Sequence, residues 1–129
     1  MARLNIHELL EEARRKLQRL TPEQAHAASL DGGILVDTRD EADRREQGVI
    51  ARARHCPLSV LEWMLDPESG NNEPDIDLDS WVILICKEGY SSSLAAARLK
   101  GLGFSRATDV IDGVVGWKAA GLPIGPPPT

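Results

Sequence analysis

Cysteine, aromatic residues and long apolar runs are all scarce in this sequence. Its 129 residues include two cysteines, Cys56 and Cys86, and only 4% of them are aromatic. No apolar stretch approaches the roughly 20 residues that a membrane-spanning helix needs. Basic residues are not in excess either: the net charge is −5 at pH 7, whereas general nucleic-acid binding needs a basic face. The sequence therefore predicts neither a membrane protein nor a nucleic-acid-binding protein.

The cysteines and histidines do not form a pattern typical of metal binding. Cys56 and Cys86 lack C-x-x-C spacing, and His7, His26 and His55 are scattered. We therefore expect no metal and no cofactor. The first residues mix acidic with basic side chains and lack an apolar core followed by a cleavage site, which argues against a secretory signal or a transit peptide. We expect a cytoplasmic protein.

The length and composition fit one globular domain with its own hydrophobic core. The sequence is 42% hydrophobic and 27% charged, which is ordinary for such a domain. Near the start, Asn5 and Glu8 form a capping box ahead of apolar residues at helical spacing. We expect an N-terminal amphipathic helix within residues 1–20, a main domain over residues 21–123 and a proline-rich tail over residues 124–129.

Beyond the first helix, short apolar runs alternate with helical patterns. A capping threonine, a proline and a glutamine at residues 21–24 begin a second helix. Further helices are expected at 40–47, at 59–65 with Ser59 as the cap, at 92–100 and at 114–120, and strands at 34–37, 52–56, 82–85 and 107–111. This alternation predicts an α/β fold with an open, mostly parallel sheet and helices on both faces.

The connection at residues 66–79 stands apart in composition. It contains six acidic residues, no basic residue and two prolines. Such a composition is typical of a solvated connection between elements. A docking patch for a basic partner is the alternative interpretation.

Residues 82–103 are the most informative part of the sequence. The apolar run indicates a strand buried on both faces, Cys86 follows its carboxyl end, and a helix begins near Ser92 after a short loop. In a parallel sheet, ligands bind at the carboxyl ends of the strands, and a helix N-terminus favours negative charge. A thiol there has its thiolate form stabilised, which makes it a better nucleophile. Cys86 is therefore a candidate reactive cysteine, and a buried inert thiol is the alternative.

Four segments, in the same order along the chain, resemble the rhodanese-like (sulfurtransferase) family. They are ILVDTRD at 34–40; Gly48-Val49-Ile50 followed by Ala53 and Pro57; CKEGYSSS at 86–93; and DGVVGWKAAGLP at 112–123. The resemblance covers about residues 21–123 and implies a single rhodanese-like domain. It also implies an enzyme of the thiosulfate sulfurtransferase type without a cofactor.

The resemblance further implies sulfur transfer through a persulfide on Cys86. The donor would be thiosulfate or polysulfide, and the acceptor would be cyanide, a small thiol or a protein thiol, with no nucleic acid and no membrane involved. Asp37 and Arg39 would form a supporting ion pair. The substrate-binding loop that the resemblance implies consists of Lys87, Glu88, Gly89, Tyr90, Ser91 and Ser92.

The sequence departs from the family pattern in two places. Val49 and Arg52 replace a histidine and a glycine, which affects local packing more than catalysis. Ser91 stands where the loop often has arginine, so cationic help for an anionic donor must come from Lys87 or be replaced by backbone N–H groups. Related phosphatases use a Cys-x5-Arg loop, and the residue at that arginine position is Ser92, which argues against phosphatase chemistry.

Two alternatives to a free enzyme stay open. One is a non-catalytic rhodanese-like module that binds a partner, and the other is a sulfur carrier that serves one dedicated partner. Cys56 is interpreted as a packing residue, with a resolving partner for Cys86 as its alternative.

Overall fold

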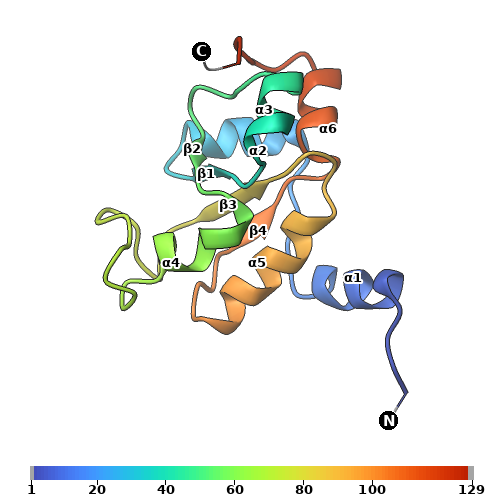
Figure 1. Ribbon diagram of the computed structural model, residues 1–129, viewed down its shortest axis with the longest axis vertical. Helices are drawn as coiled ribbons and strands as arrows, with labels where there is room; N and C mark the ends of the chain where they lie inside the picture. The colour runs from blue at the N-terminus through green and yellow to red at the C-terminus, as the bar shows by residue number, and fades with distance from the viewer. Residues whose placement is uncertain (1, 128–129) are drawn as a thin grey trace.

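The computed structural model describes residues 2–127 and confirms the α/β fold with a parallel sheet. Four strands lie in the order β2-β1-β3-β4 (Figure 1). Their bounds are Ile34–Asp37 for β1, Arg54–His55 for β2, Val82–Ile85 for β3 and Thr108–Asp109 for β4. β1 and β3 pair residue for residue, from Ile34 opposite Val82 to Asp37 opposite Ile85. The carboxyl ends of the strands therefore meet at one edge, where Cys86 follows β3.

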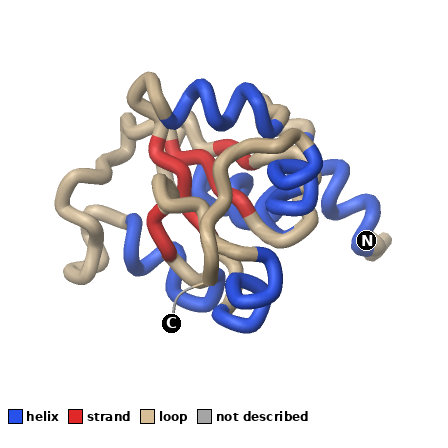
Figure 2. The backbone as a smooth tube through the Cα atoms, turned by 90° about the horizontal axis from the view of Figure 1, so that it is seen from above, coloured by secondary structure: helices blue, strands red, loops and turns tan. Residues whose placement is uncertain are grey.

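Helices cover both faces of this sheet (Figure 2). They are α1 Ile6–Arg14, α2 Pro22–Ser29, α3 Glu41–Gln47, α4 Leu61–Leu65, α5 Ser91–Gly101 and α6 Gly113–Ala119. Leu84 of β3 belongs to the same hydrophobic cluster as Leu99 of α5, whereas its neighbour Ile83 clusters with Trp117 of α6. Because both faces of β3 are buried, its sequence is an unbroken apolar run. Within residues 2–127, no helix is long and apolar enough to cross a membrane.

The N-terminal segment is joined to the edge of the sheet. Asn5 and Glu8 form the predicted capping box at the start of α1, and α1 lies against α5 (Figure 1). After α1 the chain runs beside β4, where the Leu20 N–H donates to the Asp109 carbonyl (3.1 Å) and the Ile111 N–H donates to the Leu20 carbonyl (2.8 Å). These bonds bring the residues just before Leu20 to the carboxyl end of β4.

Two local predictions need correction. Ser59 does not cap the helix that follows Pro57. Instead, Leu58–Val60 form a 3-10 turn in which the Val60 N–H donates to the Pro57 carbonyl (3.0 Å), and α4 begins at Leu61 without a side-chain cap. The outer strands β2 and β4 are also shorter than expected, because each pairs with its inner neighbour through only two residues.

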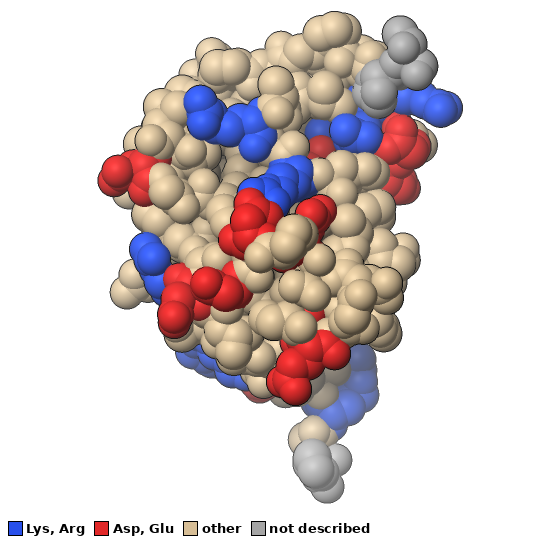
Figure 3. Space-filling view, turned by 90° about the vertical axis from the view of Figure 1, so that its left-hand side faces the viewer, with Lys and Arg blue, Asp and Glu red and all other residues tan. Residues whose placement is uncertain are grey.

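The acidic segment at 66–79 is anchored at two points. Ile76 is buried, and Asp75 forms an ion pair with Arg54 of β2. Hydrogen bonding to the Arg54 guanidinium lowers the pKa of the Asp75 carboxyl. Figure 3 views the side of the molecule from which this segment projects in Figure 1, and acidic and basic side chains lie next to one another across it. Part of the acidic charge is therefore matched within the chain.

A buried ion pair holds the turn that follows β1. The guanidinium of Arg39 donates twice to the Asp37 carboxylate, at 2.9 and 2.7 Å, and both side chains are almost fully buried. Arg39 also donates to Gln47 at the end of α3 (3.3 Å). The pair is bidentate, so it fixes the direction in which the chain leaves the sheet beside Cys86.

We expect Asp37→Ala to lower the free energy of unfolding by about 3–5 kcal/mol, because Arg39 would remain as a buried charge without its partner. Urea denaturation of the wild type and the variant measures this difference. The matched control is Asp43→Ala, because Asp43 forms a partly exposed pair with Lys87 (3.6 Å) and its loss should cost under about 1 kcal/mol. Equal losses in the two variants would contradict the supporting role of the Asp37–Arg39 pair.

Candidate active site

The candidate site is built around the sulfur of Cys86. This side chain is 5% exposed and sits between the end of β3 and the start of α5. Its Sγ accepts a hydrogen bond from the Gly89 N–H (3.1 Å), and the thiol donates to the Ser92 hydroxyl (3.2 Å). The loop at 86–89 therefore folds back over the sulfur. A negative charge at Sγ would meet a backbone N–H and the N-terminal end of α5.

Two glycines make this tight loop sterically feasible. Gly89 has φ +88°, and a Cβ there would lie 2.7 Å from the backbone nitrogen of Asp112. Gly113 has φ +53°, and a Cβ there would collide with the Cys86 carbonyl. The start of α6 can therefore approach closely enough for the Val114 N–H to donate to the Cys86 carbonyl (2.9 Å). The backbone on both sides of the thiol is fixed by α6 as well as by α5.

A buried carboxylate that sequence reasoning missed stands behind the sulfur. Asp109, the last residue of β4, is fully buried, and its Oδ2 accepts hydrogen bonds from the hydroxyls of Ser92 (2.8 Å) and Ser93 (2.7 Å). Its charge is balanced by Arg19, whose Nε and Nη2 donate to the two carboxylate oxygens at 2.8 and 3.2 Å. A polar chain therefore runs from Cys86 through Ser92 to Asp109 and Arg19.

Arg14 and Arg19, both in the N-terminal segment, were also missed as site residues. Arg14 donates to the Gly89 carbonyl (2.8 Å) and to the Ser93 hydroxyl (3.1 Å), and Arg19 reaches the same carbonyl (3.2 Å). An aspartate inside an apolar strand is the one sequence signal that could have led to this network, because a buried carboxylate requires a partner. Nothing in the local sequence identifies Arg14 or Arg19 as that partner.

The residues predicted for the loop occupy three different environments. Ser92 lies at the sulfur and bonds Asp109, and it does not cap α5, which begins at Ser91 without a side-chain cap. Ser91 and Lys87 line a cavity of about 290 Å³ in front of Cys86. Glu88 is exposed, and Tyr90 is 60% exposed with the Arg14 guanidinium 5.9 Å from its ring centroid.

The front cavity joins the two halves of the predicted site. Thr38, Arg39 and Asp40 line one wall, so the turn that the Asp37–Arg39 pair holds faces the loop. The Asp37 carboxylate itself bonds Arg39 and not the sulfur. This position agrees with a supporting role and gives neither residue a direct contact with the reacting atom.

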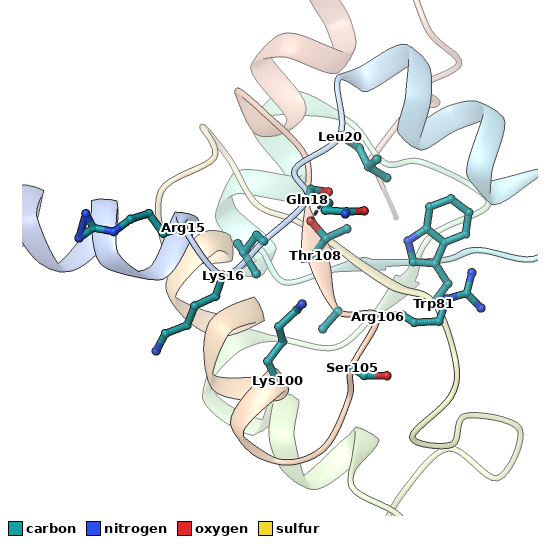
Figure 4. A pocket seen from close by; sticks show the side chains of 11 residues that line it. Arg15, Lys16, Gln18, Leu20, Trp81, Lys100, Ser105, Arg106 and Thr108 are labelled. Atoms are coloured by element: carbon teal, nitrogen blue, oxygen red, sulfur yellow. Dashed lines mark hydrogen bonds between the residues drawn. The ribbon is translucent and has the colours of Figure 1, made fainter.

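A larger cavity of about 520 Å³ lies away from the thiol (Figure 4). Basic side chains line it, including Lys100 and Arg106, and Arg106 stacks over the ring of Trp81, with its guanidinium 5.1 Å from the ring centroid. Because Trp81 comes just before β3, this cavity is at the opposite end of that strand from Cys86. Among residues 2–127, no cluster of three or more His, Cys, Asp or Glu side chains could hold a metal ion.

Cys56 has a contrasting environment. It is fully buried in the apolar cluster of Leu61 and Leu84, and burial raises the pKa of its thiol to about 11, with a further contribution from Glu73. It follows β2, two positions across the sheet from β3. Two strand spacings amount to about 10 Å, beyond the reach of a disulfide. This geometry favours the packing interpretation over a resolving partner for Cys86.

The domain is thus a parallel α/β sheet with a loop-cradled thiol at its carboxyl edge. The sequence model of the rhodanese-like domain family matches residues 21–120, and the chain belongs to this family. A relative from Pseudomonas savastanoi, called thiosulfate sulfurtransferase GlpE, is 36% identical over 81% of this chain and 90% of its own length. The relative of that name from Pseudomonas entomophila is 33% identical over 81% and 87%. These relatives support an enzyme of the sulfurtransferase type.

Solved structures extend the comparison. A Rhodopseudomonas palustris protein of unknown function, described as a possible tyrosine phosphatase, has a TM-score of 0.86, 28% identity and 96% coverage of both chains. The polysulfide-sulfur transferase homodimer of Wolinella succinogenes has a TM-score of 0.69 and 22% identity, covering 89% of this chain and 82% of its own. The second likeness shows the shared fold alone.

The raised pKa of Cys56 predicts a specific loss of stability at alkaline pH. A thiol whose pKa rises from 9.0 to about 11 on folding stabilises the protein fully below pH 9, and this contribution is lost as the pH rises through 11. We expect the free energy of unfolding to fall by about 2 kcal/mol more in the wild type than in Cys56→Val over that interval. Denaturant unfolding at pH 8, 9, 10 and 11 tests this, and parallel curves for the two proteins would contradict it.

Proposed function

We propose that the protein is a thiosulfate-type sulfurtransferase that carries a sulfane sulfur on Cys86. The observation that carries the proposal is the loop geometry: a thiol at the carboxyl end of β3 with the Gly89 N–H 3.1 Å from its Sγ. A negatively charged sulfur requires hydrogen-bond donors, and this loop supplies them from the backbone. Membership of the rhodanese-like family supports the same chemistry.

In the proposed first half-reaction, the Cys86 thiolate attacks the outer sulfur of thiosulfate. A new S–S bond forms to Sγ, the S–S bond of thiosulfate breaks, and its electron pair leaves with sulfite. The product is a persulfide anion on Cys86, and the total charge is unchanged. In the second half-reaction a nucleophile such as cyanide or a thiolate takes the outer sulfur and the bonding pair returns to Sγ. Polysulfide can replace thiosulfate as the donor, with a shorter polysulfide as the leaving group.

Ser92 is suited to follow the charge on the sulfur. When Cys86 is protonated, the Ser92 hydroxyl accepts a hydrogen bond from the thiol and donates one to Asp109. When the sulfur becomes a thiolate or a persulfide, rotation of this hydroxyl turns its proton toward Sγ. Asp109 tolerates the loss because Ser93 and Arg19 still donate to it. The hydroxyl can therefore donate to the sulfur in the charged states without leaving a buried carboxylate unpaired.

Phosphatase chemistry is the competing function, favoured by the description of the R. palustris structure. Phosphate binding in a cysteine loop relies on a bidentate arginine fork. The corresponding position holds Ser92, whose hydroxyl bonds the buried Asp109 carboxylate. Without that fork the loop has no bidentate clamp for a phosphate group, so the sulfur-transfer proposal accounts better for these residues.

Intact-mass analysis tests the proposal directly. After incubation with thiosulfate, and separately with polysulfide, we expect the wild type to gain one sulfur, which cyanide removes, and Cys86→Ala to gain none. Loading with slow discharge to cyanide would favour a dedicated carrier. Absence of loading from both donors would reject the enzyme and favour a partner-binding module. Hydrolysis of p-nitrophenyl phosphate that Cys86→Ala lacks would support the phosphatase instead.

Lys87 provides a test of how the anionic donor is attracted. Its side chain is 41% exposed at the front cavity, and position 91 holds serine where the family loop often has arginine. We expect Lys87→Gln to lower kcat/KM for thiosulfate by about threefold to tenfold at low salt, with the difference shrinking as salt is added. Lys118→Gln, on exposed α6 surface, is the control. A change of the same size in both variants would show that only the net charge matters.

A further inference from the structure

The Gly89 carbonyl receives an unusual set of donors. Arg14 Nη2 lies 2.8 Å from this oxygen and Arg19 Nη2 lies 3.2 Å away. The Ser93 hydroxyl is 3.4 Å away, and its single proton is donated to Asp109 at 2.7 Å. Two guanidinium groups therefore converge on one backbone oxygen, and both come from the segment before residue 21, outside the part of the chain that matches the family model. The R. palustris structure covers 96% of this chain, which extends that likeness into the N-terminal segment.

The direction of this carbonyl determines what the loop presents to the sulfur. In a trans peptide the C=O and the following N–H point in opposite directions. Because the arginines hold the Gly89 carbonyl, the Tyr90 N–H of the same peptide points away from them. A flip of this peptide would exchange the two groups and turn a carbonyl oxygen inward. Gly89, at φ +88°, is a residue type for which such flips have a low steric cost.

From this arrangement we propose that Arg14 and Arg19 are positioning residues that clamp the Gly89–Tyr90 peptide with its N–H toward the sulfane sulfur. The loop has serine at position 91, where a positively charged arginine is common. In this chain two arginines behind the loop act instead, by fixing the orientation of the Gly89–Tyr90 peptide. Arg14 makes two contacts in this clamp, to Gly89 and to Ser93. Arg19 makes the third contact, to the Gly89 carbonyl, and also neutralises Asp109. The same cation therefore supports both the clamp and the hydrogen-bond chain from Cys86 through Ser92 to Asp109. This inference rests on the proposed sulfur transfer.

Arg14 offers the cleanest test because Arg15, at the C-cap of α1, is a matched control. Arg14 is half-buried against the loop, whereas the Arg15 side chain is 66% exposed and pairs with Glu11 at 3.5 Å. We would prepare Arg14→Met, Arg15→Met and Arg14→Lys in the full chain and measure single-turnover rate constants for loading by thiosulfate and discharge to cyanide. A single-turnover rate constant does not depend on the fraction of protein that is folded, so a merely structural role would leave it unchanged.

We expect Arg14→Met to slow loading by about tenfold, because a charge-assisted hydrogen bond to the loop is lost, and Arg15→Met to change it by less than about twofold. Arg14→Lys should recover part of the rate, since an ammonium keeps the charged donor. Equal rate constants for Arg14→Met and the wild type would overturn the clamp. So would equal slowing in Arg14→Met and Arg15→Met.

A second measurement separates failure of the clamp from failure of the proposed function. Alkylation of Cys86 by iodoacetamide needs no sulfur donor, and the buried Cys56 serves as the unreactive internal reference. If the wild type accepts no sulfur, the proposed function fails, while slower alkylation in Arg14→Met than in Arg15→Met would still support the clamp. Because Arg19→Gln alone would leave Asp109 unpaired, Arg19 is tested with Asp109→Asn in the same chain. Compared with Asp109→Asn alone, this double variant should lose further rate, and equal rates in the two would exclude Arg19 from the clamp.

Discussion

The ion pair between Arg19 and Asp109 is the interaction on which the candidate site depends. A carboxylate without solvent contact is costly unless charge and hydrogen bonds compensate it, and Asp109 receives both. Meeting its oxygens requires the first turn of α5 and the N-terminal segment to lie at the end of β4. Ser92 is thereby placed 3.2 Å from the Cys86 sulfur. The Ser92 hydroxyl therefore lies next to the thiol because it is one of the donors that the buried Asp109 carboxylate requires.

Charge is unevenly divided between the front and the back of the sulfur. In front, the cavity carries Lys87 paired with Asp43, so its charge is nearly balanced and accessible to solvent. Behind, two arginines and one aspartate leave a net positive charge that contacts the loop through hydrogen bonds to Gly89, Ser92 and Ser93. Backbone dipoles turned toward the sulfur transmit this charge without exposing a cation to the ligand. Such a loop stabilises anionic sulfur without a fixed fork that would select one anion shape.

The sequence was informative where the cause of a structure is local. Capping boxes at Asn5 and Thr21, the doubly buried strand before Cys86 and the alternation that gives a parallel sheet all depend on neighbouring residues, and the structure has each of them. The cap at Ser59 was wrong because the proline before it starts a 3-10 turn. The Asp109 network could not be predicted for a different reason. Arg19 and Asp109 are 90 positions apart, and the pairing of Leu20 with Val110, just after β4, brings them together.

The two cysteines show why residue type alone does not define the site. Both are buried and both follow parallel strands, yet Cys56 is surrounded by apolar side chains that raise its pKa to about 11, whereas Cys86 meets an N–H, a hydroxyl and a helix start. Burial by itself therefore disfavours the thiolate form of a cysteine. A reactive thiol needs hydrogen-bond donors that point at its sulfur, and those donors keep their direction only while the peptides that carry them are held in place. In this chain the groups that hold them lie largely outside the loop itself, in β4, α6 and the N-terminal segment.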